Sequence, residues 1–300
     1  MSSRYKAIAI ETQYWKPRDD YIEQLIQAIK NVVQEGDIIS ISEKAVSTAT
    51  GNLIDEKKVK PKILAYFIAK YWMRKVWPYI LGPMCHLRQK TIDQLRSYPI
   101  EEGSRHKQLA LDQGGFLQAL MHGSEASIDG SNIPYSYVSL PLENSWKIAQ
   151  EIQRKVETEL GKTVTVVVVD TDKTYSLWGF HFTPHPKPIN GIHSVGGVLA
   201  YIVGRSLKLK KRATPLAVVG IQYSTEEAIE IAKIANRTRG SGSGRTVWDM
   251  AQKFNVKLTD VTWKMLRTVK HHPIVIIRSK GKRRSNFKMT CSGEEESGIN

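Results

Sequence analysis

The chain has few cysteines and no long run of uncharged apolar residues. Its two cysteines, Cys85 and Cys291, are too few for a disulfide framework or for a zinc site made of four cysteines. The most apolar stretch, residues 63–77, contains three basic side chains, whereas a membrane-spanning helix needs about 20 predominantly apolar residues. The N-terminal residues predict a strand and a loop rather than a signal peptide. We therefore expect a soluble, cytoplasmic protein without a membrane partner.

Acidic residues are scarce in the last third of the chain. The 300 residues include 44 Lys and Arg against 29 Asp and Glu, a formal net charge of +15. Residues 201–300 contain 20 of these basic and 8 of these acidic side chains, a net charge of +12. This concentration indicates a partner that carries phosphates, although a solvated basic surface has the same composition.

The hydrophobic pattern predicts a mixed α/β (α+β) fold. The clearest element is a strand at 163–169, whose valine run is typical of a central strand buried on both faces. The other expected elements are strands at 7–10, 38–42 and 215–221, helices at 19–34, 144–160 and 195–203, two or three helices within 61–98, a helix that Thr225 caps and that ends near Arg239, and loops at 42–51, 178–192 and 207–212.

A run of alternating glycine and serine, Gly240–Gly244, predicts a flexible linker. It divides the chain into a domain of residues 1–238 and a basic, helical C-terminal extension of residues 239–300.

The extension has a pattern like that of a helix-turn-helix. Helices are expected at 246–254 and 259–269, then a strand at 274–278 and a basic run at 280–284. Strand and basic run would form a wing that contacts nucleic acid phosphates. The alternative, which we favour, is that two helices and a strand pack on the domain without nucleic acid.

Two aspartates are expected where strands end. Asp170 directly follows the valine strand, and Asp129 lies in a polar loop, three residues before Asn132. Because loops at strand ends carry many functional residues, the pair predicts a site for Mg²⁺ or Mn²⁺, which prefer oxygen ligands. The alternative is that both aspartates cap backbone amides in turns.

Three histidines, His181, His185 and His193, lie in a proline-rich segment. Since the prolines exclude a helix there, the histidines would form a metal or substrate site only from a loop. Capping or surface histidines are the alternative.

Three segments resemble the coenzyme F420 γ-glutamyl ligase family. They are residues 36–51, residues 127–175 and, more weakly, residues 214–235. They occur in the order of the family, and the middle one is specific because a strand, a loop, a helix and both aspartate motifs fall at matching places. The resemblance implies a γ-glutamyl-ligase-like fold with a mixed sheet.

The resemblance also implies a set of site residues. Asp129 and Asp170 match the aspartates that bind a divalent metal, Mg or Mn. Asn132 matches the asparagine that contacts the guanine nucleotide, and Thr171 matches a threonine at a second metal. Lys16 is the nearest match to a basic residue in a loop that contacts GTP.

The activity that the resemblance implies is that of a GTP- and metal-dependent amide-bond ligase. A small-molecule carboxylate is activated as an acyl phosphate, and the amine of glutamate then displaces phosphate. A homodimer is also implied.

The sequence departs from the family at several positions. Thr48 and Thr50 replace a nucleotide-binding lysine and a glutamate. The basic segment 204–215 replaces a glycine-rich loop whose glutamate binds the second metal. Either this basic loop neutralises the phosphates, or the second metal and the original reaction are lost. We therefore expect a changed substrate. A second hypothesis is a non-catalytic protein of the same fold that binds nucleic acid or another anionic partner.

Overall fold

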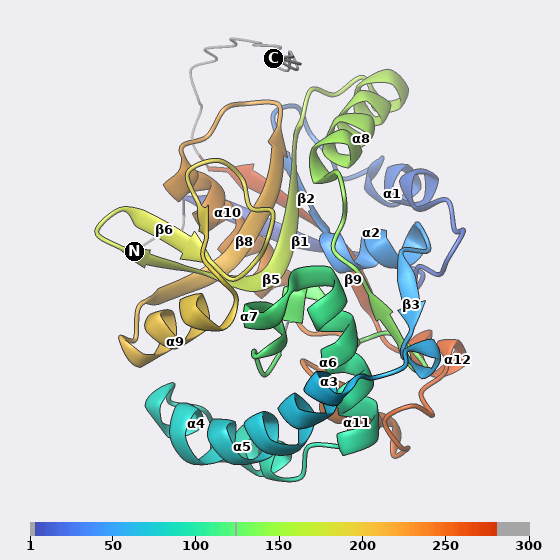
Figure 1. Cartoon of the computed structure of the whole chain (residues 1–300). Helices are drawn as coiled ribbons and strands as arrows, with labels where there is room; N and C mark the ends of the chain where they lie inside the picture. The colour runs from blue at the N-terminus through green and yellow to red at the C-terminus, as the bar shows by residue number, and fades with distance from the viewer. Residues whose placement is uncertain (1–3, 124, 281–300) are drawn as a thin grey trace, which may run out of the picture.

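The computed structural model describes residues 4–123 and 125–280, and it consists of a mixed sheet with helices on both faces (Figure 1). The strands of the main sheet are β1 (Tyr5–Thr12), β2 (Ile38–Ser42), β5 (Thr165–Leu177), β6 (Phe180–Thr183), β7 (His193–Ser194), β8 (Lys210–Val219) and β9 (His271–Ser279). Their order is β1-β9-β2-β5-β6-β7, and β8 pairs with β5. β2 runs parallel to β5 and β7 parallel to β6, whereas the other neighbours are antiparallel. The expected mixed α/β fold is confirmed.

The valine strand lies at the centre of the sheet, and its side chains alternate between two cores. Val166 and Val168 face the core that is covered by α1 (Tyr21–Ile29), α2 (Glu43–Ala49) and α8 (Ser145–Leu160). Val167 and Val169 face the opposite core, under α10 (Thr225–Arg239). All four are fully buried, as expected for a strand covered on both faces.

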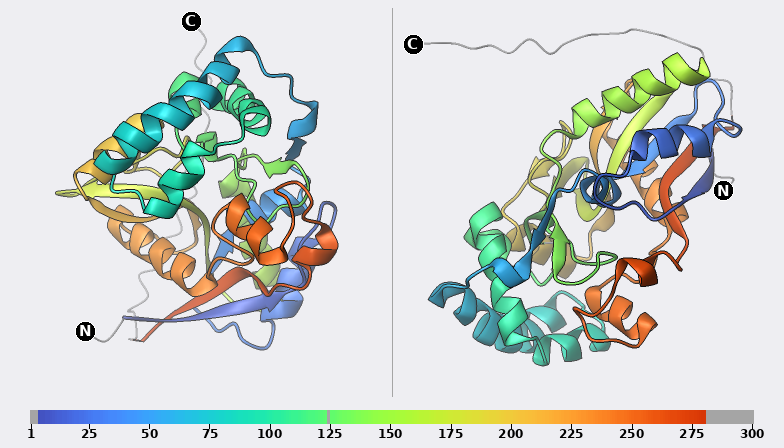
Figure 2. Two further views of the ribbon diagram at one scale, coloured as in Figure 1. Left: turned by 90° about the horizontal axis from the view of Figure 1, so that it is seen from below. Right: turned by 90° about the vertical axis from the view of Figure 1, so that its right-hand side faces the viewer.

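A layer of helices lies beyond one end of the sheet (Figures 1 and 2). It packs around its own apolar core, in which Met73 and Trp77 are fully buried and which Ile128 joins. In the described part of the chain, no helix is long and apolar enough to cross a membrane. The elements of the layer are α3 (Ile63–Phe67), the π-helix η2 (Ile68–Leu81), α4 (Gly82–Met84), α5 (Gln89–Arg96), α6 (Ile100–Gly114), α7 (Phe116–Ala119) and α9 (Val198–Ser206). A separate two-stranded sheet consists of β3 (Leu53–Asp55) and β4 (Tyr137–Ser139).

The C-terminal extension joins the main sheet. The strand expected at 274–278 is present as β9, but it pairs with β1 on one side and β2 on the other instead of forming a wing. The helix expected at 246–254 is α11 (Val247–Phe254), whereas the one expected at 259–269 is reduced to the single turn α12 (Trp263–Leu266). A one-turn helix is too short to lie in a major groove as a recognition helix, so the nucleic-acid alternative is not favoured.

The boundary expected between residues 238 and 239 therefore does not separate two sheets, since β9 belongs to the same sheet as β1 and β2. Cys291 and most of the basic run at 280–284 lie outside the described residues.

Several expected loops and boundaries are corrected by the structure. Residues 42–51, expected as a loop, contain helix α2, and 178–192 contains β6. The expected basic loop at 207–212 ends inside β8, and the valine strand continues as far as Leu177. These local sequences lack a clear period. β6 and the extended part of β5 form because neighbouring strands supply hydrogen-bond partners, whereas α2 is stabilised by burial of residues such as Val46 and Ala49 in the core. Ser224, not Thr225, caps α10 through a capping box with Glu227.

Because β9 is a central strand, shortening one of its core side chains should destabilise the whole domain. Ile276 is 1% exposed and pairs with Ile8 and Ile39. We expect Ile276→Ala to lower the free energy of unfolding by about 2–5 kcal/mol, measured by urea denaturation. The same change at Ile63, which is 90% exposed, is the control and should cost less than about 0.5 kcal/mol. Equal small effects at both positions would mean that β9 is not part of the core.

Candidate active site

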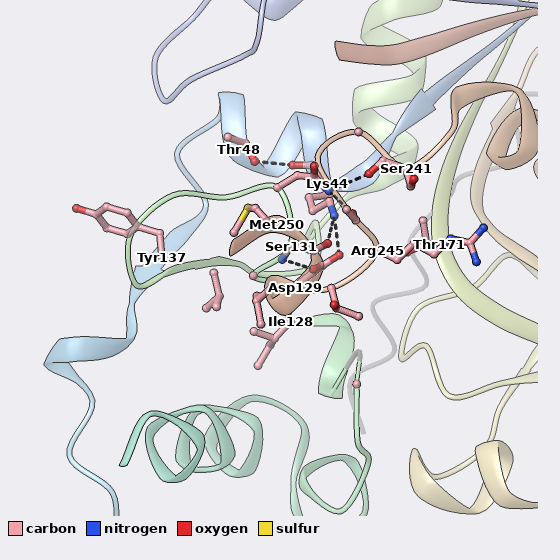
Figure 3. A pocket seen from close by; sticks show the side chains of 18 of the residues that line it. Lys44, Thr48, Ile128, Asp129, Ser131, Tyr137, Thr171, Ser241, Arg245 and Met250 are labelled. Atoms are coloured by element: carbon pink, nitrogen blue, oxygen red, sulfur yellow. Dashed lines mark hydrogen bonds and ion pairs between the residues drawn. The ribbon is translucent and has the colours of Figure 1, made fainter. Parts of the chain in front are cut away.

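A large cavity lies where β2 ends and β5 bends. Its volume is about 930 Å³. Residues from the end of β2 and α2, the loop at 128–138, the middle of β5, α6 and the C-terminal segment line it. Ligands of α/β sheets commonly bind at the carboxyl ends of strands, and this cavity has that position relative to β2. Figure 3 shows the side chains of its inner wall.

Asp129 lies in the loop between η3 (Glu125–Ser127) and β4, and its carboxylate forms an ion pair with Lys44. Its Oδ2 accepts a hydrogen bond from Lys44 Nζ at 2.8 Å, and its Oδ1 accepts one from the backbone N–H of Ser131 at 2.7 Å. Lys44 Nζ also donates to Ser131 Oγ at 2.8 Å (Figure 3). The result is a fixed pair of opposite charges at the cavity wall. The expectation that Asp129 lies in a loop is confirmed.

Asp170 lies inside β5, not at its end as expected. The ladder with β8 passes from the pair Asp170–Thr214 to the pair Lys173–Ala213, so Thr171 and Asp172 form a bulge. Bulges redirect side chains and are frequent beside active sites. Here the bulge places Asp170, Thr171 and Lys173 at the cavity.

Two residues that the sequence patterns did not bring together lie next to Asp170. Within residues 4–123 and 125–280, Glu43, Asp170 and His185 form the group whose potential metal-ligand atoms all lie within 4.8 Å of one another. Glu43 comes from the first turn of α2, and His185 follows β6. His185 had been noted for its spacing to other histidines, but its partners are carboxylates instead. Asp129, the expected second ligand, does not belong to this group.

Glu43 and His185 form a buried, hydrogen-bonded pair, and burial raises the pKa of the Glu43 carboxyl. Nε2 of His185 lies 3.4 Å from Oε2 of Glu43, whose Oε1 accepts the backbone N–H of Leu142 at 2.8 Å. Burial alone would lower the pKa of His185, but the hydrogen bond and charge of Glu43 and the charge of Asp170 raise it to about 9. Nδ1 of His185 accepts the N–H of Lys187 at 3.1 Å, so the proton that faces Glu43 is the one on Nε2. Two carboxylates and an imidazole are suitable donors for a divalent cation such as Mn²⁺, which would displace that proton.

Asn132 faces the cavity but is bound to the protein itself. Its Nδ2 donates to the carbonyl of Gly244 at 2.9 Å, and its Oδ1 accepts from the N–H and Oγ of Ser243 at 2.6 and 2.5 Å. The glycine–serine run, expected as a flexible linker, is therefore an anchored part of the cavity wall, with Ser243 buried. The amide that the resemblance assigns to guanine binding is already engaged.

The remaining expected site residues lie in different places. Thr171 lines the cavity, and its carbonyl accepts a hydrogen bond from Lys173 Nζ at 2.6 Å. Lys16 is not among the residues that line the cavity, although its neighbours Tyr14 and Trp15 are. Its backbone N–H donates to Asp19 Oδ2 at 2.9 Å. The structure thus brings together Asp129, Asn132, Asp170 and Thr171, without Lys16.

The basic loop expected to neutralise phosphates points elsewhere. Arg212 is buried, and its two terminal nitrogens donate to the two carboxylate oxygens of Glu226 at 2.5 and 2.7 Å. The hydrogen bonds of Arg212 lower the pKa of Glu226 to about 2. None of residues 204–215 lines the cavity.

A second charged cluster lines the part of the cavity that α6 and the short helix η1 (Glu56–Lys58) form. His106 on α6 contacts Glu56 in η1 at 2.5 Å and Glu125 at 3.2 Å. The fully buried Lys107 donates to Glu125 and to the carbonyl of Met121. Burial would lower the pKa of His106, but the charges of the two glutamates raise it to about 10. No sequence spacing joins residues this far apart, so only the fold shows the cluster.

Comparison with known proteins identifies the class and then the family. A family model described as F420-0:Gamma-glutamyl ligase matches residues 9–247. An uncharacterised protein of Methanocaldococcus jannaschii is 36% identical over 287 residues, which cover 92% of this chain and 97% of that protein. A coenzyme F420:L-glutamate ligase of the same organism is 26% identical over 228 residues, covering 71% of this chain and 81% of that ligase. The coenzyme F420:L-glutamate ligase of Methanopyrus kandleri is 25% identical over 156 residues, covering 52% and 55%.

These matches define a family of amide-bond ligases. The chain belongs to the F420-0:gamma-glutamyl ligase family, as the matched residues 9–247 show. The family assignment made from the motifs is therefore confirmed. The matched residues include the anchored glycine–serine run but end before α12 and β9.

The charge of His106 should make stability depend on pH. Its pKa is about 10 in the folded protein and about 6.5 in an unfolded chain. The stability that the charged His106 contributes to the folded protein is therefore fully present below about pH 6.5 and is lost as the pH rises through about 10. The free energy of unfolding is measured in urea at several pH values for wild type and His106→Gln. Between about pH 6.5 and 10 it should fall less in the variant than in the wild type. The exposed His86→Gln should keep the wild-type profile, and identical profiles for all three proteins would contradict the assignment.

Removing the Asn132 side chain should release the glycine–serine run. In Asn132→Ala the buried N–H of Ser243 loses its acceptor, which costs about 1–3 kcal/mol. We expect amide hydrogen exchange in residues 240–246 to accelerate by about tenfold or more. Ser241→Ala is the control, since only the backbone carbonyl of Ser241 contacts Asn132. Unchanged exchange in Asn132→Ala would show that other contacts hold the loop.

Proposed function

We propose that the protein is a nucleotide- and divalent-metal-dependent ligase that joins glutamate to the carboxylate of a small molecule, with GTP as the first candidate nucleotide. The observation that carries the proposal is the position of Asp170, which reaches the cavity from the β5 bulge next to Glu43 and His185. Membership of the γ-glutamyl ligase family supports the amide-forming chemistry.

Asp170, Glu43 and His185 are the residues whose ligand atoms lie close enough together to hold a divalent ion. Asp129, the other aspartate that the resemblance assigns to the metal, lines the same cavity. A bound ion supplies positive charge to the phosphate oxygens. Lys44, fixed by Asp129 and Ser131, contributes a further charge at the same wall.

The proposed reaction has two steps. A carboxylate oxygen of the acceptor attacks the terminal phosphorus, the bond to the nucleoside diphosphate breaks, and an acyl phosphate forms. The amine of glutamate attacks the acyl carbon, phosphate leaves with one proton from the nitrogen, and an amide remains. Both steps depend on positioning and on charge neutralisation, for which a cavity with fixed charged groups is suited.

The family departures support a changed acceptor. Thr48 lines the cavity, where its hydroxyl donates to the carbonyl of Lys44 at 2.8 Å. The Thr50 hydroxyl donates to the carbonyl of Val46 at 2.9 Å. Thr48 does not supply the positive charge of the lysine that it replaces, and Thr50 is not among the residues that line the cavity. This part of the wall therefore carries less charge than the resemblance implies.

The proposal predicts metal-dependent nucleotide binding that requires Asp170. Calorimetric titration of GTP and ATP with Mn²⁺ should show binding to the wild type. Asp170→Asn should weaken it by at least about 100-fold, because an amide is a poorer ligand than a carboxylate. Incubation with glutamate and a panel of carboxylic acids should release nucleoside diphosphate and phosphate only when an acceptor is present.

The matched control is Asp93→Asn on α5, which removes an aspartate paired with Arg96 outside the cavity. This variant should bind nucleotide as the wild type does. If wild type shows no metal-dependent nucleotide binding, the ligase proposal is wrong.

A further inference from the structure

Three cations line the cavity close to Asp170. Arg239 is the last residue of α10, Arg245 follows the glycine–serine run, and Lys173 ends the β5 bulge. All three line the same cavity although they come from elements far apart in the sequence.

In the described part of the chain, none of these three cations forms an ion pair with a carboxylate. Asp170 and Asp172 lie near enough to act on the charge of Lys173, and Asp170 and Asp129 on that of Arg239. Lys173 Nζ donates to the Thr171 carbonyl, and Arg239 Nη2 donates to Asn236 Oδ1 at 3.2 Å. Arg245 is exposed to the cavity, and none of the side-chain hydrogen bonds within residues 4–123 and 125–280 involves its guanidinium. Guanidinium groups with unused donors are suited to phosphate oxygens.

The hydrogen bonding of these cations differs from that of the buried Arg212. Arg212 has both terminal nitrogens engaged by Glu226, as a structural ion pair does. Arg239 is affected by the charges of Asp170 and Asp129, which oppose the lowering of its pKa by burial, yet it forms no ion pair with either. An anion between Arg239 and Arg245 would complete the charge balance of this wall.

The backbone that carries Arg245 is held in place before any ligand binds. Asn132 fastens Ser243 and Gly244. Gly242 has φ +60°, and a Cβ there would lie 2.7 Å from Asn132 Oδ1, so a side chain would disrupt the contact. Thr246 then caps α11 by accepting the N–H of Asp249 at 3.1 Å. Arg245 is thus fixed at both sides, which reduces the entropy lost on binding.

We propose that Arg239, Arg245 and Lys173 form a subsite for a phosphate group, supplying the positive charge that the family obtains from a second metal. The inference rests on the proposed function, in which this group is the terminal phosphate of the nucleotide. A phosphate carried by the acceptor has the same chemistry. Segment 204–215 cannot take this role, because none of its residues lines the cavity.

Calorimetry on the full chain at constant ionic strength tests the subsite. GTP, GDP and GMP are titrated with Mn²⁺ into wild type, Arg245→Gln and Arg239→Gln. If the subsite holds the terminal phosphate, both variants bind GTP about tenfold to 100-fold more weakly and GMP within about twofold of wild type. If it holds a phosphate of the acceptor, the variants instead weaken the binding of orthophosphate to protein saturated with a β,γ-imido analogue of GTP. Either result supports the subsite.

The matched control is Arg267→Gln, which removes one charge from an exposed position of the same segment outside the cavity. Arg245→Lys should recover only part of the affinity, since lysine lacks the planar fork. If both glutamine variants bind every probe as Arg267→Gln does, the subsite is wrong while the proposed function stands.

If wild type binds no nucleotide, the proposed function fails and the subsite is judged with pyrophosphate alone. Binding that Arg245→Gln weakens and Arg267→Gln does not supports the subsite, and any other pattern overturns it. Thermal melts of the variants confirm that they are folded.

Discussion

β5 pairs with β2 along one edge and with β8 along the other, and its valines fill the cores on both faces. Such a strand cannot shift its register without moving both cores, since every side chain would change face. The bulge at Thr171 and Asp172 lies between two segments of β5 that both pair with β8. Asp170, Thr171 and Lys173 owe their place at the cavity to this constraint. The pairing within the sheet fixes the position of β5, and the bulge directs its polar side chains toward the cavity.

The C-terminal segment depends on the same sheet. α10 packs on one face of it, and β9 is inserted between β1 and β2. The residues that join them, 240–270, must cross from one fixed point to the other. These residues line the cavity and form hydrogen bonds with Asn132. They also contact α5 of the helical layer through the ion pair between Lys90 and Asp249 at 2.8 Å. Arg245 lines the cavity because the segment that contains it must connect α10 to β9, which pairs between β1 and β2.

Two clusters of buried ionisable groups lie at or near the cavity, and each is held by internal partners. Glu43 and His185 lie next to Asp170, and Glu125 contacts His106 and Lys107. Taking charges out of water is costly unless partners and hydrogen bonds compensate. Both clusters satisfy this condition with partners from distant elements. The cations near Arg245 differ, because the protein leaves them facing the cavity without carboxylate partners.

The sequence by itself determined the mixed fold, the central valine strand and most helices, because hydrophobic period and capping residues are local properties. It also indicated Asp129, Asp170 and the family, since these depend on short motifs. Helix α2, strand β6 and the pairing of β9 depend on neighbours distant in the chain, so local patterns could not predict them. For the same reason only the tertiary structure placed Glu43 and His185 beside Asp170, tied Asn132 to a run that looked like a linker, and turned Arg239 and Arg245 toward one cavity.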